Sequence, residues 1–277
     1  GDPCQLGPII RGHYPDDEPL YGSLFDALER ATGPHRLTVT YRCNRVLVTY
    51  PRARFYPDYR AAPSAAERRV VVRNCEDPVA RAFLDPERPI VLAEYDGPSA
   101  SVANEFEAAL VAHLLRHARA ALCDPATGKP YDAHGWREEA VAVLTPHRAQ
   151  VATILEALRR HGFDPEDLPV VDTVERLQGS ERELVLVSTA VADPEFALSE
   201  ADFLFDERRF NVCVTRARRK VIVLIHRHLL ELVPDRDAHL RATLLFRRYR
   251  GHLRPAERLG FQGRAVQLHV RTFGRGV

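Results

Sequence analysis

The chain has 277 residues and a formal net charge of +1, and 45% of its residues are hydrophobic. This length and composition allow a core of useful size, in one large domain or in one domain with appendages. The near-zero net charge excludes a strongly basic protein that coats nucleic acid. No apolar run approaches the ~20 residues of a membrane span, and no signal peptide opens the sequence. We therefore expect no membrane partner.

Five cysteines are scattered along the chain without a CxxC pair, at positions 4, 43, 75, 123 and 213. This pattern favours reduced thiols over a disulfide framework or a zinc site. We therefore expect an intracellular protein, cytoplasmic or associated with the nucleoid, in which this chain builds no metal site. The sequence contains no Met at all, so we also expect it to be a piece of something longer.

Short runs of β-branched and apolar residues alternate along the chain with stretches of helical periodicity. The runs expected to form strands are 37–41, 70–73, 90–94, 141–145, 170–173, 184–189 and 221–225. The expected helices are 104–121 and 148–161. Several of the strands are apolar on both faces, as in the middle of a parallel sheet. The alternation predicts an α/β fold with a mostly parallel sheet between helices.

The ends of the chain have a different character. Residues 1–34 are rich in Pro and Gly and contain one expected helix at 23–30. Residues 51–69 have the composition of an irregular connection. After the last strong strand, a basic stretch at 247–254 precedes a further expected strand at 265–270. The central α/β domain is expected to run from about residue 36 to residue 232, with 51–69 as an irregular connection inside it and the two ends outside it.

Polar residues that could bind a ligand stand at the ends of several expected strands. Ligands bind at such strand ends in open α/β sheets. Thr145 and Pro146 directly follow one strand, and backbone N–H groups at such a helix start bind anions. An ordinary Thr N-cap with Pro at the first helical position explains the same pattern. A loop at 172–182 contains Thr173, Gln178, Gly179 and Glu181. Any polar strand connection with a Gly has a similar composition.

Cations crowd the start of the strand at 221–225, where Arg216, Arg218, Arg219 and Lys220 occupy four of five positions. Crowded cations repel one another, and a bound anion is one source of the counter-charge that offsets this repulsion. A solvated helix end, stabilised by the helix dipole, is the alternative. Arg42 follows the expected strand at 37–41, so it also projects from a strand end where a ligand could bind. A surface ion pair is the more common role for a lone Arg. Nearly all cationic residues of the chain are Arg, which binds phosphate in a bidentate manner that Lys cannot match. An Arg-rich genome composition would explain the same excess of Arg over Lys.

Six stretches, in this order, resemble the motifs of superfamily 1 helicases, in the 5′-to-3′ branch that contains the nonsense-mediated-decay RNA helicase and its DNA-acting relatives. GDPCQLGPI resembles motif III, and TYRCN with YPRARFY resembles the motif IV region. VLTPHRAQ is similar to the threonine-proline motif of the second motor domain. DTVERLQGSERELVLVST and RRFNVCVTRARRKVIVLI are similar to motifs V and VI. The resemblance covers roughly residues 1–232.

The resemblance implies a RecA-like, P-loop NTPase-type domain over 35–233, the second of two such motor domains. Residues 1–34 would then be the trailing segment of the first RecA-like domain, with motif III and a connector, and residues 234–277 a C-terminal extension. Helicases of this kind bind ATP and Mg²⁺ between the two domains, and single-stranded DNA or RNA across both. The implied partners are therefore a single strand and the first RecA-like domain of the same parent protein.

Matching positions assign nucleotide contacts to five residues. Gln5 would sense the γ-phosphate, and Arg42 and Arg216 would be arginine fingers that reach the β- and γ-phosphates. Glu181 would contact the ribose or help link the nucleotide and nucleic-acid sites. Arg218 would be an internal brace or a secondary phosphate contact. Of these, Gln5, Arg42 and Arg216 would be the catalytic residues.

The same matching assigns the single-strand contacts to the threonine-proline motif and to motif V. Thr145 and Thr173 would hold backbone phosphates, with nearby main-chain N–H groups contributing. The neighbouring positions expected at this interface are Pro146, Gln178 and Gly179. Such contacts fix the register of a strand without reading its sequence.

The sequence also departs from a complete motor, because it contains no GxxxxGK[ST] motif. The Lys and Ser/Thr that bind phosphate and Mg²⁺ are therefore missing, and we expect this fragment alone to lack ATPase activity. A non-enzymatic RecA-like scaffold that binds nucleic acid is the main alternative, although a scaffold has no use for phosphate ligands that reach across a cleft. A nuclease is disfavoured because Glu175, Glu181 and Glu183 lie in one loop without two-metal spacing. The absence of GxGxxG disfavours a Rossmann oxidoreductase.

Overall fold

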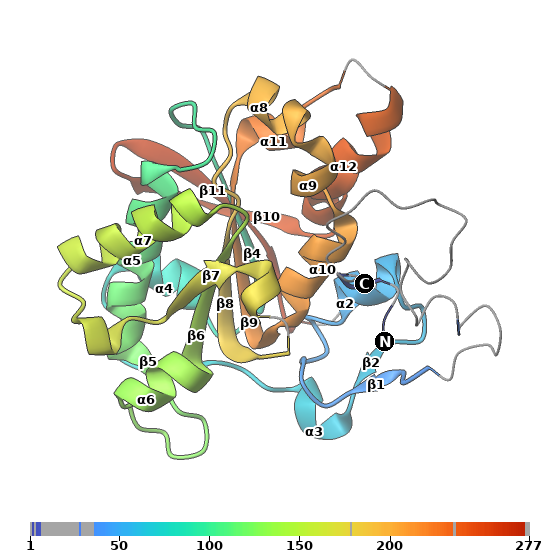
Figure 1. The fold of residues 1–277 in the computed structure, drawn as a ribbon. Helices are drawn as coiled ribbons and strands as arrows, with labels where there is room; N and C mark the ends of the chain where they lie inside the picture. The colour runs from blue at the N-terminus through green and yellow to red at the C-terminus, as the bar shows by residue number, and fades with distance from the viewer. Residues whose placement is uncertain are drawn as a thin grey trace.

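The structure, a computed structural model, describes residues 2, 4–6, 28, 36–177, 179–234 and 237–274. These residues form a seven-stranded sheet with the order β10-β11-β4-β9-β8-β6-β7 (Figure 1). Its strands are β4 (Ile90–Tyr95), β6 (Val141–Thr145), β7 (Val170–Thr173), β8 (Arg182–Ser188), β9 (Ala217–His226), β10 (Arg254–Phe261) and β11 (Arg264–Arg271). Strands β4, β9, β8, β6 and β7 run parallel, and β11 and β10 add an antiparallel edge. The mostly parallel α/β sheet expected from the sequence is confirmed.

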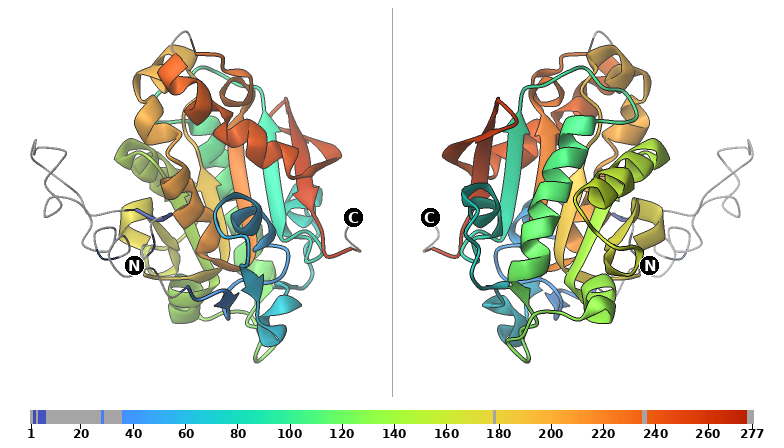
Figure 2. Two further views of the ribbon diagram at one scale, coloured as in Figure 1. Left: turned by 90° about the vertical axis from the view of Figure 1, so that its right-hand side faces the viewer. Right: turned by 90° about the vertical axis from the view of Figure 1, so that its left-hand side faces the viewer.

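Helices cover both faces of the sheet (Figure 2). One face carries α4 (Pro78–Leu84), α5 (Glu105–Ala121) and α7 (Arg148–Arg160). The other carries α2 (Thr49–Arg54), α8 (Pro194–Ser199), α9 (Ala201–Leu204), α10 (Glu207–Thr215), α11 (Arg227–Glu231) and α12 (Asp237–Gly251). Shorter turns are α3 (Pro63–Ala66), α6 (Ala133–Gly135), the π-helical η2 (Trp136–Ala140) and the 3-10 turns η3 (Pro165–Asp167) and η4 (Val174–Leu177).

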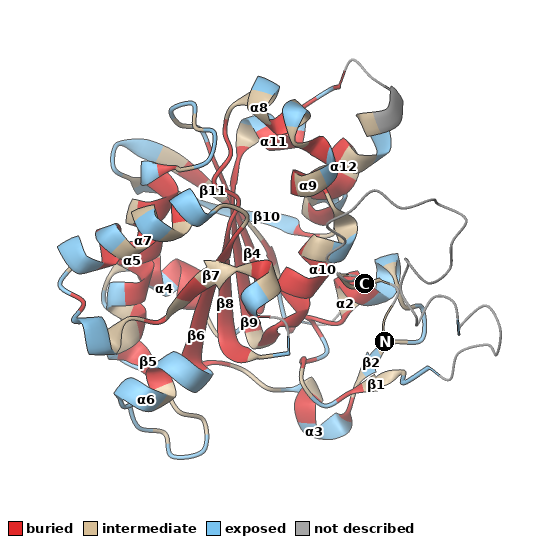
Figure 3. Cartoon of the chain, in the orientation of Figure 1, coloured by how far each residue is buried: buried red, intermediate tan, exposed pale blue. Residues whose placement is uncertain are grey.

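The hydrophobic core lies on both faces of the sheet, because the central strands point apolar side chains toward both faces. Along β8, Val185 and Val187 face the α10 side, whereas Leu184 and Leu186 face the α5 side. Every residue of β4, β6 and β8 is buried, as the red centre of Figure 3 shows. Burial of each Val, Leu or Ile side chain in these strands contributes about 1.5–3 kcal/mol, so the strands form a stable base for the residues at their ends.

Local signals start and stop the two long helices of one face. The Asn104 side chain caps α5 by accepting a hydrogen bond from the Glu107 backbone N–H at 3.0 Å. The helix ends at Ala121, because Leu122 adopts extended backbone. Helix α7 begins two residues after Pro146. The helices expected at 104–121 and 148–161 are therefore confirmed to within one residue at each end.

Two expected strands do not join the main sheet. The run 37–41 yields only β1 (Val39–Thr40), which pairs with β2 (Arg60–Ala61), and 70–73 yields β3 (Val71–Val72), which pairs with β5 (Leu122–Cys123). The side chains at the ends of the first run, Leu37 and Tyr41, are 95% and 71% exposed, so this run has no two-sided core contact. The segment 51–69, expected to be irregular, contains part of α2 together with β2 and α3.

The last part of the chain belongs to the main sheet. Strand β11, expected at 265–270, pairs with β4 over six residues, from Val266 opposite Tyr95 to Arg271 opposite Ile90. Helix α12 packs Leu245 and Phe246 into the core. The helix expected at 23–30 falls outside the described residues except for Leu28. None of the described helices is long and apolar enough to cross a membrane.

Candidate functional site

The cluster of cations lies at the edge of the sheet where β8 and β9 begin. Helix α10 runs toward this edge and ends at Thr215, Arg216 caps it, and β9 starts at once. Glu181 directly precedes β8, and Arg182 of β8 is in register with Ala217 of β9. The expectation that ligand residues gather where strands end is therefore wrong for this cluster. Because α10 runs antiparallel to β9, which follows it, the last residues of α10 lie at the amino-terminal edge of the parallel strands.

Two of the predicted residues meet through a shared carboxylate. Glu181 accepts a hydrogen bond from Arg42 Nε and another from Arg218 Nε, the latter at 2.7 Å. Burial alone would raise the pKa of Glu181, but the hydrogen bonds from the two guanidinium groups outweigh it and hold the pKa below its ordinary value. Glu181 therefore stays ionised and positions both arginines.

Arg42 and Arg216 approach the same turn of α10 from different parts of the chain. Arg42 donates from Nη1 to the Thr215 carbonyl at 3.2 Å, and Arg216 donates from Nε to the Val212 carbonyl at 3.3 Å. Burial and the nearby Arg42 charge lower the pKa of Arg216. The side chain of Arg216 is buried, with the residue 4% exposed, and Nη1 also donates to the Ser180 carbonyl at 3.5 Å.

The chain supplies counter-charges for its own cations. Glu183 pairs with Arg218 at 3.2 Å and also with Arg219. Lys220 is buried, and its Nζ donates to the Asp85 carbonyl at 2.9 Å, where burial lowers its pKa to about 7. An outside anion is therefore not needed to balance Arg218 and Arg219, because Glu181 and Glu183 pair with them, and Lys220 faces the interior.

The described part of the N-terminal segment docks on the same helix. The Gln5 side chain donates to Asp2 Oδ2 at 2.8 Å, and the Tyr56 hydroxyl donates to the same oxygen at 2.7 Å. Asn211 on α10 donates to the Cys4 carbonyl at 2.8 Å. These bonds hold Gln5 against α10, which also carries the carbonyl partners of Arg42 and Arg216.

This edge of the sheet presents solvent-accessible charge and one exposed ring. The side chains of Arg42 and Arg218 are 30% and 29% exposed, so an arriving anion can reach them. Tyr41, next to Arg42, is 71% exposed, and a bare aromatic face stacks readily on a flat base. Sequence reasoning missed Tyr41, although an aromatic residue beside a candidate phosphate ligand was the available signal. Guanidinium donors, with an exposed ring on the residue next to Arg42, offer the groups that can bind a nucleoside triphosphate.

Three of the predicted single-strand residues, Thr145, Pro146 and Thr173, lie at the other edge of the sheet. Thr145 and Thr173 are register partners at the carboxyl ends of β6 and β7. Thr145 is fully buried, and its hydroxyl has no hydrogen-bond partner among the described residues, whereas Thr173 is half-buried. A direct contact from the Thr145 side chain therefore requires its surroundings to open.

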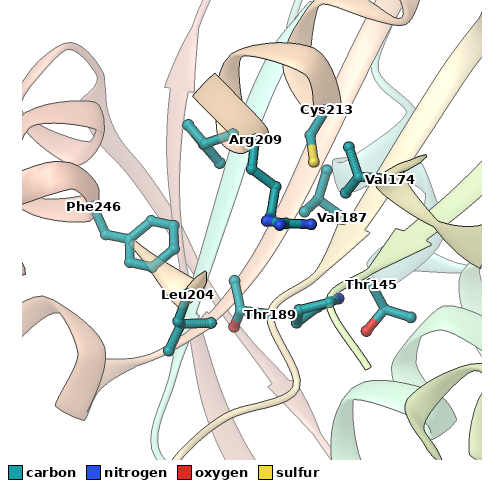
Figure 4. Close-up of a pocket in the computed structure, with 10 residues that line it drawn as sticks. Thr145, Val174, Val187, Thr189, Leu204, Arg209, Cys213 and Phe246 are labelled. Carbon is teal, nitrogen blue, oxygen red and sulfur yellow. The ribbon is translucent and has the colours of Figure 1, made fainter. Parts of the chain in front are cut away.

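A small cavity at this edge is lined in part by Thr145 (Figure 4). Its lining residues are Thr145, Pro146, Val174, Val187, Thr189, Leu204, Arg209, Phe210, Cys213 and Phe246. Arg209 from α10 points into it, pairs with Glu175 and lies over the Phe203 ring at 4.1 Å. The cavity thus combines an apolar wall with one cation, and sequence reasoning missed Arg209 because α10 carries it to this edge.

The two sets of residues stand at opposite ends of β8. Seven strand residues span about 23 Å, which separates Glu181 at the start from Thr189 at the cavity. Because β7 and β8 are parallel, the segment between them returns from one edge to the other. Gly179 lies on this return with a φ of +94°, which an L side chain rarely adopts. Gln178 lies outside the described residues.

A mostly parallel sheet between two helix layers defines an α/β domain of the RecA-like, P-loop NTPase-type class. A family model described as an AAA domain matches residues 20–228. Together with the relatives below, this match shows that the chain belongs to the superfamily 1 helicase family, in the branch of the nonsense-mediated-decay helicases.

Three relatives illustrate the similarity. The chain is 30% identical over 228 residues to the ATP-dependent helicase NAM7 of Saccharomyces cerevisiae, which covers 81% of this chain and 22% of the relative. It is 27% identical to the DNA replication ATP-dependent helicase/nuclease DNA2 of Mus musculus, with 81% and 22% covered. It is 26% identical to the regulator of nonsense transcripts 1 homolog of Drosophila melanogaster, with 88% and 20% covered. The chain thus spans about a fifth of the length of these relatives.

Proposed function

We propose that this chain is the C-terminal motor domain of an ATP-dependent DNA or RNA helicase or translocase. The observation that carries the proposal is the convergence of Arg42 and Arg216 on the last turn of α10, with Glu181 bonded to Arg42, although 174 residues separate the two arginines in sequence. In the proposed motor this edge faces the first RecA-like domain, and the bound nucleotide lies between the two. A scaffold without enzymatic activity is the competing proposal.

Arg42 and Arg216 have different tasks at the proposed nucleotide site. Arg42 is already accessible and is held in place by Glu181, so it meets the phosphates first. Arg216 is bonded to the neutral carbonyls of Val212 and Ser180. These carbonyls give the guanidinium no counter-charge, whereas a phosphate oxygen supplies one together with a bidentate hydrogen-bonding partner. A phosphate oxygen therefore draws Arg216 away from these carbonyls only when the triphosphate is in place.

Other residues would bind the rest of the nucleotide and the single strand. Gln5 and Arg218 complete the phosphate side, and the Tyr41 ring stacks on the base. ATP brings Mg²⁺, whose ligands the first RecA-like domain supplies, so the isolated chain is inactive in this proposal. Thr145 and Thr173 hold backbone phosphates of single-stranded DNA or RNA. Pro146, Gln178 and Gly179 belong to the same proposed interface, which the cation Arg209 borders.

The test uses the complete parent protein with substitutions at Arg216. Arg216→Ala should reduce ATP turnover by about 10³-fold, the lower range for loss of an arginine finger. Arg216→Lys keeps a buried cation but loses the planar fork, so it should also reduce turnover while preserving the fold. Single-strand binding without nucleotide should persist in both variants, as measured by fluorescence anisotropy.

Arg219→Lys is the matched control, because Arg219 lies three residues away and pairs with Glu183. Its turnover should stay within about twofold of the parent protein, because the lysine keeps a positive charge beside Glu183 and Arg219 has no assigned contact with the nucleotide. Full turnover in Arg216→Lys and Arg216→Ala would reject the nucleotide role and favour the scaffold.

A further inference from the structure

Three metal-ligating side chains meet where α4 adjoins α5. Asp77 precedes α4, and His113 and His117 stand one turn apart on α5. His113 Nε2 lies 3.0 Å from Asp77 Oδ1, and His117 Nε2 lies 3.9 Å from Asp77 Oδ2. These elements contribute none of the residues assigned above to the nucleotide or the single strand.

Among the residues that the structure describes, these three alone form a group of His, Cys, Asp or Glu whose ligand atoms all lie within 4.8 Å of one another. We propose that Asp77, His113 and His117 bind one divalent transition-metal ion of the Zn²⁺ class. Two imidazole nitrogens and one carboxylate are a favourable donor set for such an ion, and a water molecule completes a tetrahedral site.

The donor spacing suits an ion with little rearrangement. Two bonds of about 2.0–2.2 Å at a tetrahedral angle span donors about 3.3–3.6 Å apart, and the distances from the two histidines to Asp77, one to each carboxylate oxygen, bracket this span. His113 and His117 are four residues apart on one helix, so they share a face. Side chains that are 22% to 34% exposed leave an entry path for the ion and its water.

Neighbouring groups already orient the ligands. The Ala80 backbone N–H donates to Asp77 Oδ1 at 2.7 Å and fixes the carboxylate. The Phe261 ring packs against His113, with ring centroids 5.2 Å apart. Such outer contacts hold ligands in place in metal sites. A bound ion would replace the His113–Asp77 hydrogen bond and join α4 to α5.

Only the histidine pair of this proposed site could be recognised from the sequence. His113 and His117 stand one turn apart within the helix expected at 104–121. Asp77 comes 36 residues before His113, so only the packing of α4 against α5 reveals the third ligand. The expectation that this chain builds no metal site rested on the cysteines and did not weigh the histidine pair.

The test measures Zn²⁺ binding to the purified 277-residue chain by isothermal titration calorimetry, after chelator treatment. One Zn²⁺ should bind per chain and raise the melting temperature. Asp77→Asn keeps a good helix cap but removes the charged ligand, and His117→Ala removes a group with only a 3.9 Å contact to Asp77. Either change should weaken Zn²⁺ binding by about 100-fold or more, because lost outer contacts alone cost 10–100-fold.

His134→Ala is the control, because His134 is exposed on a different segment. It should leave Zn²⁺ affinity unchanged. Absence of Zn²⁺ binding by the unaltered chain would overturn the proposal. Equal Zn²⁺ affinity in the His117→Ala, Asp77→Asn and His134→Ala variants would also overturn it. In that case Asp77 and His113 would only form a structural hydrogen bond between α4 and α5.

Discussion

Glu181→Gln tests whether one carboxylate organises the cation cluster. The substitution keeps the side-chain shape but removes the charge that Arg42 and Arg218 share. Hydrogen bonds to a charged group contribute about 1.5–3 kcal/mol each when buried, and exposed ion pairs about 0.2–1 kcal/mol. Because the Glu181 side chain is 31% exposed, two bonds of about 1 kcal/mol each are expected. The free energy of unfolding should therefore fall by about 2 kcal/mol.

Thermal unfolding of the purified chain measures this loss. At about 2–4 °C per kcal/mol for a chain of this size, the melting temperature should fall by about 4–8 °C. Glu67→Gln is the matched control, since Glu67 also pairs with two arginines, Arg45 and Arg69, but its side chain is 58% exposed. Its melting temperature should stay close to that of the unaltered chain. Equal effects of the two substitutions would refute the bridging role of Glu181.

The pH dependence gives a second criterion for Glu181. Its pKa is held below the ordinary value in the folded chain, so the folded state favours the ionised form. The stabilisation is fully present above the ordinary pKa of about 4.3 and is lost as pH falls through the folded-state value. The difference between the unaltered chain and Glu181→Gln should persist at neutral pH and vanish in acid. A difference that stays constant at low pH would contradict an ionic cause.

Two further predictions concern the other edge of the sheet and the core. In the complete protein, Thr173→Ala should weaken single-strand binding by a similar factor, about threefold to tenfold, for oligonucleotides of different sequence, because a backbone contact carries no sequence information. Anisotropy titrations measure this, and a loss limited to one sequence would argue against the role. Burial raises the pKa of Glu107 to about 7, so the folded chain holds a proton that the unfolded chain has released. Stability should therefore fall by on the order of 3 kcal/mol as pH rises from about 4.5 to 7. Urea unfolding should show a flatter pH dependence for Glu107→Gln, and identical slopes would refute the assignment.

The sequence predicted the parts of the fold that depend on local pattern. Strands such as β4 and β8 are apolar on both faces, and only the middle of a parallel sheet buries both. The run at 37–41 has a similar composition, yet it forms only β1, with Leu37 95% exposed. Strand pairing depends on distant partners, here β2, which the local pattern does not contain.

The site shows the same division between local and distant information. The motif resemblance indicated that Arg42 and Arg216 belong together, and the structure brings both to α10. It did not indicate that Glu181 bridges Arg42 and Arg218, or that Thr145 is buried. Those facts follow from how β8, β9 and α10 pack, because a side chain's burial is decided by elements far away in the sequence.

Helix α10 is the element that contacts both edges of the sheet. Its first turns carry Arg209 into the cavity beside Thr145, and its last turn supplies the carbonyls that hold Arg42 and Arg216. In the proposed motor, a triphosphate that draws Arg216 away from the Val212 carbonyl frees that last turn. The buried strand β8 stays fixed beneath it, so a shift of this short helix would reach Arg209 at the far edge. In the proposed motor, this helix would therefore connect the nucleotide site to the single-strand interface.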